Sequence, residues 1–258
     1  MPTVPPLVDA AVRAHISALD DRCPGLLSAM YLTGSVALAD YRVGQSDIDA
    51  VCVVAQPLGR AEMDTLRRIH RDAPPPQIDA VYVTYAELAE DPAHAKAPHA
   101  HEGRFGTDHG FDANPSVWRT LQLAPLAVRG VRTPTVWFDP DALIRWNRQN
   151  LAGYWSDWVG WLRGKEPTVG RAFDRHGLPW LVLGVSRLCY TIETLGITSK
   201  TGAGRWALDR FGGEWHPIID HALRCRAGMP PNPAYDTIER LHADAADFAD
   251  HVITAAGA

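Results

Sequence analysis

Two aspartates separated by one residue lie in the segment of the sequence best suited to chemistry. Asp47 and Asp49 open the stretch DIDAVCVVA (47–55), which then alternates apolar residues and is predicted to be a strand. Successive side chains of a strand point to opposite faces, so both carboxylates point to the same side, about 7 Å apart. Mg²⁺ prefers oxygen ligands and is usually held by one or two carboxylates together with substrate phosphates. The pair therefore predicts a magnesium site with Asp47 and Asp49 as ligands.

The residues before this strand are suited to phosphate. Gly34 ends another predicted strand, LLSAMYLTG (26–34), and its missing side chain lets phosphate oxygens approach the backbone amides. Ser35 opens the next helix as a donor and cap, and Ser46 directly precedes the aspartates. An Asp-x-Asp pair alone is a weak signal, but here it follows Gly34-Ser35 across a helix and a turn. This arrangement predicts binding of a metal-bound nucleoside triphosphate.

A third acid, Asp79, lies in the predicted strand QIDAVYVTY (77–85). If that strand lies beside the strand of Asp47 and Asp49, its carboxylate reaches the same side of the sheet. Two roles are open for it: a further metal ligand, or the general base that takes a proton from an attacking hydroxyl. The reaction would be in-line attack on the α-phosphate with pyrophosphate leaving.

The elements around these residues predict a mixed α/β first half. Helices are expected over 7–22, 59–72 and 116–128, alternating with the strands already described. Between 90 and 115 the pattern fails, and the His-, Pro- and Gly-rich segment is predicted to be a long loop or insertion that acts as a flap over the substrate. Zinc is disfavoured there because the spacing fits no standard ligand pattern; the residues concerned are His94, His99, His101, Glu102 and His109.

The second half reads as helical throughout. LPWLVLGVSRLCYTIETLG (178–196) is nearly all apolar and is predicted to be the core helix of a bundle. Trp146, Trp155, Trp158 and Trp161 share helical spacing and are expected to pack in a core. We therefore predict two domains, 1–135 and 136–258, and an α/β (α+β) fold class with a small mixed sheet followed by an all-helical bundle.

Composition restricts the partners. With 25 basic and 30 acidic residues the net charge is −5, which argues against tight nucleic-acid binding. No apolar run reaches the roughly 20 residues that cross a bilayer, and no secretion signal opens the chain. The four cysteines form no CxxC pair and are expected to be reduced thiols. We expect a monomeric cytoplasmic protein that binds a nucleoside triphosphate and a small-molecule acceptor, and neither nucleic acid nor membrane.

At LTGSVALADYRVGQSDIDAVCVV (32–54) the sequence resembles the DNA polymerase β-like nucleotidyltransferase superfamily, and it is most similar to the aminoglycoside adenylyltransferases that modify streptomycin and spectinomycin. SRLCYTIETLGITSKTGAGRWALDRF (186–211) looks like that family's second-domain helix–loop–helix. The resemblance implies ATP as donor, two Mg²⁺ ions, and transfer of AMP to an antibiotic hydroxyl in a cleft between domains.

Carried over residue by residue, the resemblance makes Gly34 and Ser35 the phosphate loop. It makes Asp47 and Asp49 the metal ligands, with Ser46 beside them. Asp79 stands where relatives place a glutamate as catalytic base and is one methylene shorter. Lys200 matches the lysine expected to approach the nucleotide phosphates.

The segment expected to bind the acceptor departs from the family pattern. Thr201 and Arg205 stand where relatives carry carboxylates that hold a cationic aminoglycoside, and an arginine facing a polycation is repulsive. A less cationic antibiotic or another hydroxylated small molecule is therefore a plausible acceptor, and Arg205 and Trp206 are candidate acceptor residues. Glu193 is either a further acceptor contact or half of a buried pair with an arginine such as Arg187.

Two alternatives stay open. The same chemistry could act on another natural product, a protein or a tRNA, as in toxin-type nucleotidyltransferases. The chain could also be a catalytically silent protein that binds a nucleotide without turnover.

Overall fold

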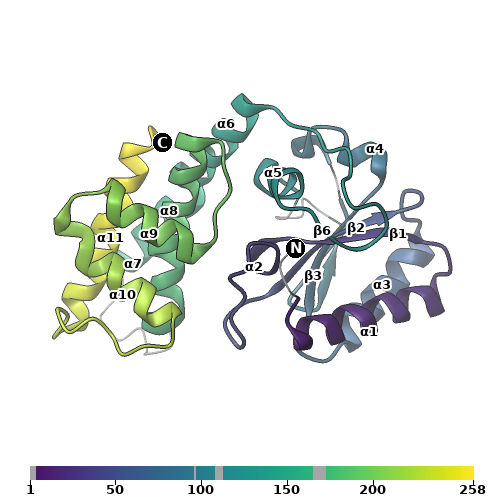
Figure 1. The fold of residues 1–258 in the computed structure, drawn as a ribbon, viewed down its shortest axis with the longest axis horizontal. Helices are drawn as coiled ribbons and strands as arrows, with labels where there is room; N and C mark the ends of the chain where they lie inside the picture. The colour runs from purple at the N-terminus through teal and green to yellow at the C-terminus, as the bar shows by residue number, and fades with distance from the viewer. Residues whose placement is uncertain (1–3, 96, 108–112, 165–172) are drawn as a thin grey trace. The chain divides into compact units, whose positions relative to one another are not determined.

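The computed structural model describes residues 4–95, 97–107, 113–164 and 173–258. The chain divides into two compact units, Met1–Asp139 and Pro140–Ala258, so the division falls four residues after the boundary expected from the sequence. Figure 1 shows the sheet in the first unit and helices in the second.

The first unit is built on a mixed sheet with strand order β5-β4-β3-β2-β1-β6. β2 and β3 are parallel, and every other neighbouring pair is antiparallel. The strands are β1 (Leu27–Leu32), β2 (Ile48–Val54), β3 (Ile78–Val83), β4 (His99–His101), β5 (Arg104–Gly106) and β6 (Leu126–Arg129). The three strands predicted around the aspartates are therefore present, and the mixed α/β fold class is confirmed.

Helices cover both faces of this sheet, as Figure 1 shows. One face packs against α1 (Pro6–Arg22) and α3 (Arg60–Asp72), and its buried residues include Cys52 and Tyr82. The other face packs against α4 (Tyr85–Leu88) and α5 (Pro115–Leu123), where Val51 and Val81 are buried in one cluster with Trp118. The alternation along each strand therefore assigns every strand residue to the α1–α3 face or to the α5 face.

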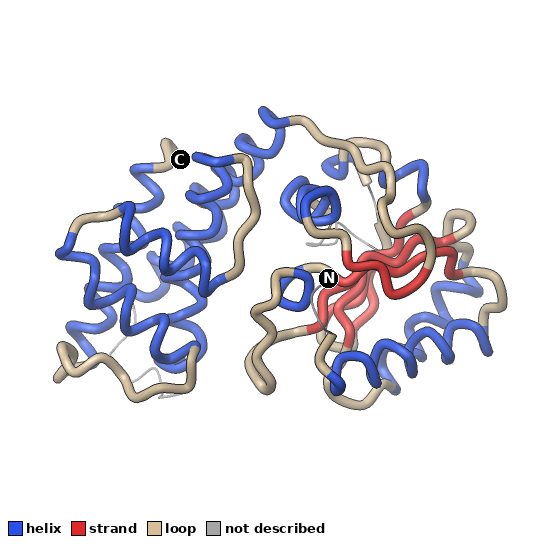
Figure 2. The backbone as a smooth tube through the Cα atoms, viewed as in Figure 1, coloured by secondary structure: helices blue, strands red, loops and turns tan. Residues whose placement is uncertain are grey.

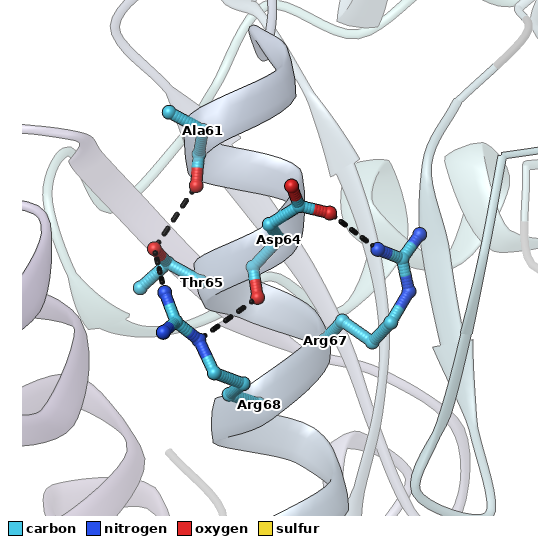
Figure 3. Close-up of polar contacts among 5 residues, drawn as sticks. All are labelled: Ala61, Asp64, Thr65, Arg67 and Arg68. Carbon is cyan, nitrogen blue, oxygen red and sulfur yellow. Dashed lines mark hydrogen bonds and ion pairs between the residues drawn. The ribbon is translucent and has the colours of Figure 1, made fainter.

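The outer surface of α3 is tied together by local polar contacts, drawn in Figure 3. Arg67 donates to Asp64 at 2.6 Å, while Arg68 donates to the Asp64 carbonyl at 3.2 Å and to the Thr65 hydroxyl at 3.1 Å. Exposed pairs of this kind contribute at most about 1 kcal/mol each. Arg67 also lies 5.8 Å from the ring centre of Phe105 on β5, which links α3 to the edge of the sheet.

A buried polar cluster lies beneath α1 and α3. The Tyr82 hydroxyl is 2.7 Å from His70 Nε2 and 3.2 Å from His15 Nε2. Burial lowers the pKa of His15 to about 4 and that of His70 to about 3. Both imidazoles are therefore neutral in the folded protein near pH 7. The Tyr82 hydroxyl forms a hydrogen bond with each of these two rings, which come from different helices.

The structure corrects the expectation that residues 90–115 form an irregular flap. A short 3₁₀ turn, Pro92–His94, leads into the hairpin β4–β5, which extends the sheet beyond β3. The turn residues Glu102 and Gly103 have φ of 48° and 73°, the left-handed values that a tight two-residue hairpin requires. His109 lies outside the described residues.

The helix predicted over 116–128 is also too long. α5 ends at Leu123 and residues 126–129 form β6, which pairs with β1. Pro125 explains the break, because proline cannot donate the backbone hydrogen bond that a continuing helix needs. The single turn α2 (Gly34–Ala37) likewise covers only part of the helical segment expected after Gly34.

The second unit contains helices and no strand among its described residues, as the blue tube of Figure 2 shows. Its helices are α6 (Pro140–Asn150), a π-helical turn (Leu151–Trp155), α7 (Ser156–Arg163), a π-helical turn (Phe173–Gly177), α8 (Leu178–Thr194), α9 (Lys200–Arg210), a 3₁₀ turn (Gly213–Trp215), α10 (His216–Arg226) and α11 (Ile238–Ala255). This all-helical half agrees with the sequence prediction.

The apolar helix α8 forms the centre of this unit's core. Its buried residues pack with those of α7, α10 and α11 in one hydrophobic cluster. Trp155 is buried in that cluster and Trp158 packs against it, whereas Trp161 is 36% exposed. All four cysteines are free, as expected. No helix in the described ranges is both long and apolar enough to cross a membrane.

Candidate active site

The three sequence-predicted aspartates lie where the amino ends of the central strands β2 and β3 meet the carboxyl end of β1; this end of the three strands is called the edge below. β1 runs antiparallel to β2, so its carboxyl end meets the amino ends of β2 and β3 at that edge. Asp49 and Asp79 are directly paired in the parallel register of β2 and β3. The Thr33 amide at the end of β1 donates to the Asp49 carbonyl at 2.9 Å. Residues from three segments of the sequence thus meet at one end of three neighbouring strands.

Two of these carboxylates, those of Asp49 and Asp79, also share a face of the sheet. Asp49 alternates in phase with Val51, and Asp79 with Val81, so both belong to the α5 face. Asp47 is exposed, Asp49 is half-buried and Asp79 is buried. The Asp47 charge contributes to raising the pKa of Asp79, so these two carboxylates lie within electrostatic reach of each other.

Gly34 is required where it stands by its contact with Asp49. Its φ is +53°, and a Cβ placed on it would collide with the Asp49 carboxylate oxygen Oδ2. A glycine at this position therefore lets the end of β1 and the carboxylate of β2 approach each other closely. The structure places the predicted phosphate-loop glycine directly against a predicted metal ligand.

The two serines of the motif behave differently. The Ser35 hydroxyl is buried and has no hydrogen-bond partner among the described residues. Such a group is costly unless something else satisfies it, as a phosphate or a metal-bound water would. The Ser46 hydroxyl instead accepts a hydrogen bond from the Arg42 amide at 3.0 Å. Ser46 therefore stabilises the turn that precedes Asp47, and its observed contact positions that residue.

Asp79 is engaged by the β4–β5 hairpin. The Glu102 amide donates to Asp79 Oδ1 at 2.9 Å, and His101 Nδ1 lies 2.7 Å from Asp79 Oδ2. Burial raises the pKa of Asp79, while the Glu102 amide and the charge of His101 oppose that shift. Sequence reasoning assigned His101 to a flap and missed this contact. The available signal was the alternation of PHAHEGRFG (98–106) around Glu-Gly, which is typical of a hairpin.

The donor set at this edge fits a magnesium-bound nucleotide. Asp47 and Asp49 offer carboxylate oxygens from positions two residues apart, and Ser35 of α2 has a buried hydroxyl with no hydrogen-bond partner among the described residues. Within the described residues, no group of three or more His, Cys, Asp or Glu side chains is arranged to hold a metal ion. This agrees with two carboxylates completed by phosphate oxygens.

The candidate residues of the second unit are described by themselves. Lys200 is the first residue of α9, whose cap is the Ser199 hydroxyl accepting from the Gly202 amide at 3.0 Å. Arg205 is exposed on the same helix. Trp206 packs against the helical core, with its ring 5.5 Å from that of Tyr190. A packing role for Trp206 is therefore established by its contacts.

Glu193 pairs with an arginine, as one of the two expectations had it, but neither the partner nor the burial is the expected one. Its carboxylate is exposed rather than buried, and it pairs with Arg210 of α9 through contacts of 3.0 and 3.1 Å, not with Arg187. Both partners are long side chains on adjacent helices, so the pair fastens α8 to α9 with the modest energy of a surface ion pair.

Comparison with known proteins agrees with the resemblance. Residues 176–255 match the model of the aminoglycoside adenylyltransferase C-terminal domain. Among solved structures, the chain is similar to the spectinomycin adenyltransferase AAD(9) from Enterococcus faecialis, solved with ATP and spectinomycin. The TM-score is 0.65 at 14% identity, over 94% of this chain and 99% of the other. No curated protein sequence matches the chain.

The two comparisons cover different parts of the molecule. The family model falls within the helical unit, from the start of α8 to the end of α11, and the fold likeness spans both units. The helical half thus matches the C-terminal domain of the aminoglycoside adenylyltransferases, and the chain as a whole has a fold similar to that of a spectinomycin adenyltransferase.

Proposed function

We propose that this protein transfers AMP from ATP to a hydroxyl group of a small-molecule antibiotic of the aminoglycoside or aminocyclitol type. The observation that supports this most directly is the pairing of Asp49 with Asp79 beside Gly34, at the edge where Asp47 and Ser35 also lie. The family of the helical domain supplies the reaction class.

In this proposal Asp47 and Asp49 hold two Mg²⁺ ions, which when bound neutralise charge on the triphosphate. Gly34 leaves room for the phosphates, and the Ser35 hydroxyl donates to one of their oxygens. Lys200, the first residue of α9, is the further residue proposed to bind the phosphates of ATP. Asp79 lies on the same face as Asp49, where the proton of the attacking hydroxyl must be removed.

The acceptor is inferred to be less cationic than streptomycin-type aminoglycosides. Arg205 is exposed and Thr201 carries no charge, so the two positions at which relatives carry carboxylates offer no negative charge to a polycation. The Thr201 hydroxyl also accepts from Arg226 Nε at 3.2 Å, which brings a second arginine to α9. Spectinomycin is the first acceptor to test, since the structurally similar enzyme was solved with it.

Pyrophosphate release tests the function. The purified protein is assayed with Mg²⁺, each of ATP, GTP, CTP and UTP, and a panel that includes spectinomycin, streptomycin and non-antibiotic hydroxyl compounds. Mass spectrometry of the acceptor should show the added mass of AMP with ATP as donor. Turnover only with tRNA, a protein or another natural product would replace the antibiotic acceptor. Binding of ATP without turnover of any acceptor would favour a silent nucleotide-binding protein.

A further inference from the structure

His101 lies on the Asp79 carboxylate in a geometry that the proposed reaction can use. Its Nδ1 is 2.7 Å from Asp79 Oδ2, yet 65% of its side chain is exposed whereas Asp79 is only 5% exposed. A buried carboxylate therefore holds an imidazole whose other face is open to solvent. This is the arrangement in which an acid orients a histidine and stabilises its protonated form.

The hairpin that carries His101 is fixed on two sides. Ala100 pairs with Ala80 of β3, and His101 pairs with Arg104 across the tight turn. Phe105 lies on the opposite face from His101, where its ring packs 6.3 Å from that of His70 and under Arg67. The position of His101 is thus set by sheet pairing and by a ring packed against α3.

Asp79 itself is poorly placed to take a proton. Oδ1 accepts from the Glu102 amide and Oδ2 contacts His101, so both oxygens are engaged, and the group is buried. Each oxygen keeps a second lone pair, but only 5% of the Asp79 side chain is exposed, so an acceptor hydroxyl has little access to it. The side chain of His101, by contrast, is 65% exposed.

We propose that His101, oriented by Asp79, is the general base of the reaction and receives the proton of the acceptor hydroxyl at Nε2. This rests on the proposed function. The hydroxyl oxygen forms its bond to the α-phosphorus of ATP while its O–H bond breaks toward His101. The bond from the α-phosphorus to the bridging oxygen breaks at the same time, and pyrophosphate leaves with that electron pair. The imidazolium then returns its proton to solvent.

Several charged groups lie around His101. Asp79 contacts it from β3, and the Asp47 charge acts on Asp79 from the start of β2. Within the hairpin, Glu102 precedes the turn glycine and Arg104 pairs opposite His101. Because a general base must be unprotonated to accept a proton, we expect the rate to fall at low pH.

The decisive variant is His101→Gln. The glutamine amide can still donate a hydrogen bond to Asp79 and so preserve the contact between the hairpin and β3, but it cannot act as a base. Steady-state rates are measured from pH 5 to 9 with ATP and the acceptor found above, together with ATP binding by calorimetry and thermal unfolding. We expect kcat to fall by about 100- to 10,000-fold, with ATP affinity and melting temperature near wild type. The acidic limb of the pH profile should disappear, and added imidazole should partly restore the rate of His101→Ala.

His99→Ala is the matched control, since His99 lies on the same strand and face and pairs with Val81 instead. Its rate should stay within about threefold of wild type. A kcat of His101→Gln within threefold of wild type would overturn the proposal. A lower kcat with an unchanged acidic limb in the pH–rate profile would overturn it too, because a His101 that only supports the structure predicts that result. If the wild-type protein transfers AMP to no acceptor, the proposed function itself fails; if wild type is active and His101→Gln is equally active, only the role of His101 fails.

Discussion

The carboxylate of Asp49 occupies the space that a side chain on Gly34 would need. Gly34 also has φ of +53°, a conformation in which any other residue is strained. One glycine thus sets the distance between the end of β1 and a predicted metal ligand on β2, so substitutions there should act on stability and activity together.

Gly34→Ala should lose about 1–2 kcal/mol of stability from the left-handed backbone alone, and more from the clash. Because Asp49 must move, nucleotide turnover should fall by more than tenfold. Urea unfolding and pyrophosphate release measure the two effects. Gly25→Ala is the matched control: Gly25 has φ of +75°, but a Cβ at that position would meet nothing within 4 Å. Equal activity of the two variants would show that the Gly34–Asp49 contact is irrelevant to turnover.

Asp47→Asn should abolish most activity while leaving the fold intact. Asp47 is exposed, so the free energy of unfolding should change by less than about 0.5 kcal/mol. The amide cannot replace an anionic ligand, and turnover should drop by orders of magnitude. Asp64→Asn on α3 removes another exposed carboxylate and should leave turnover unchanged. Activity of Asp47→Asn within tenfold of wild type would contradict its assignment as a metal ligand.

The buried histidines predict acid sensitivity. In the folded state the pKa values of His15 and His70 lie at about 4 and about 3, below the ordinary value of about 6.5. The unfolded chain therefore binds more protons as the pH falls below 6.5. Stability from these groups is fully present above that pH and is lost between roughly 6.5 and 3, by up to about 1.4 kcal/mol per pH unit for each histidine.

Urea unfolding of wild type and His70→Gln at several pH values between 7 and 4 checks this. The variant keeps a polar group near the Tyr82 hydroxyl but cannot titrate, so its stability should fall less steeply with decreasing pH. The comparison uses slopes, because the carboxylates contribute alike to both proteins. Parallel slopes would mean that His70 is not a source of the acid sensitivity.

Arg205→Glu tests the acceptor side of the helical domain. If α9 faces the acceptor, replacing an exposed cation by an anion should lower the KM for a cationic aminoglycoside by several-fold and leave the KM for ATP nearly unchanged. Arg240→Glu makes the same change of charge at an exposed position on α11 and should have no such effect. An unchanged KM for cationic acceptors in Arg205→Glu would place their binding elsewhere.

Much of this site was readable from the sequence because its signals are local. Alternation in DIDAVCVVA (47–55) put Asp47 and Asp49 on one face, and the glycine at the end of the preceding strand marked a close approach of backbone. Helix-period patterns likewise separated the helical half from the mixed half. These features depend on neighbours within a few residues, and the order of the chain already contains them.

What needed the tertiary structure are the partners brought from afar. His101 reaches Asp79 only because an edge hairpin pairs with β3, and the Tyr82 hydroxyl joins two histidines from different helices. Glu193 pairs with Arg210 of the next helix, although Arg187 is nearer in sequence. A periodic pattern tells which face a side chain lies on, but not which distant element packs against that face. That choice is made by strand pairing and by helix packing, which bring together residues that no local pattern connects.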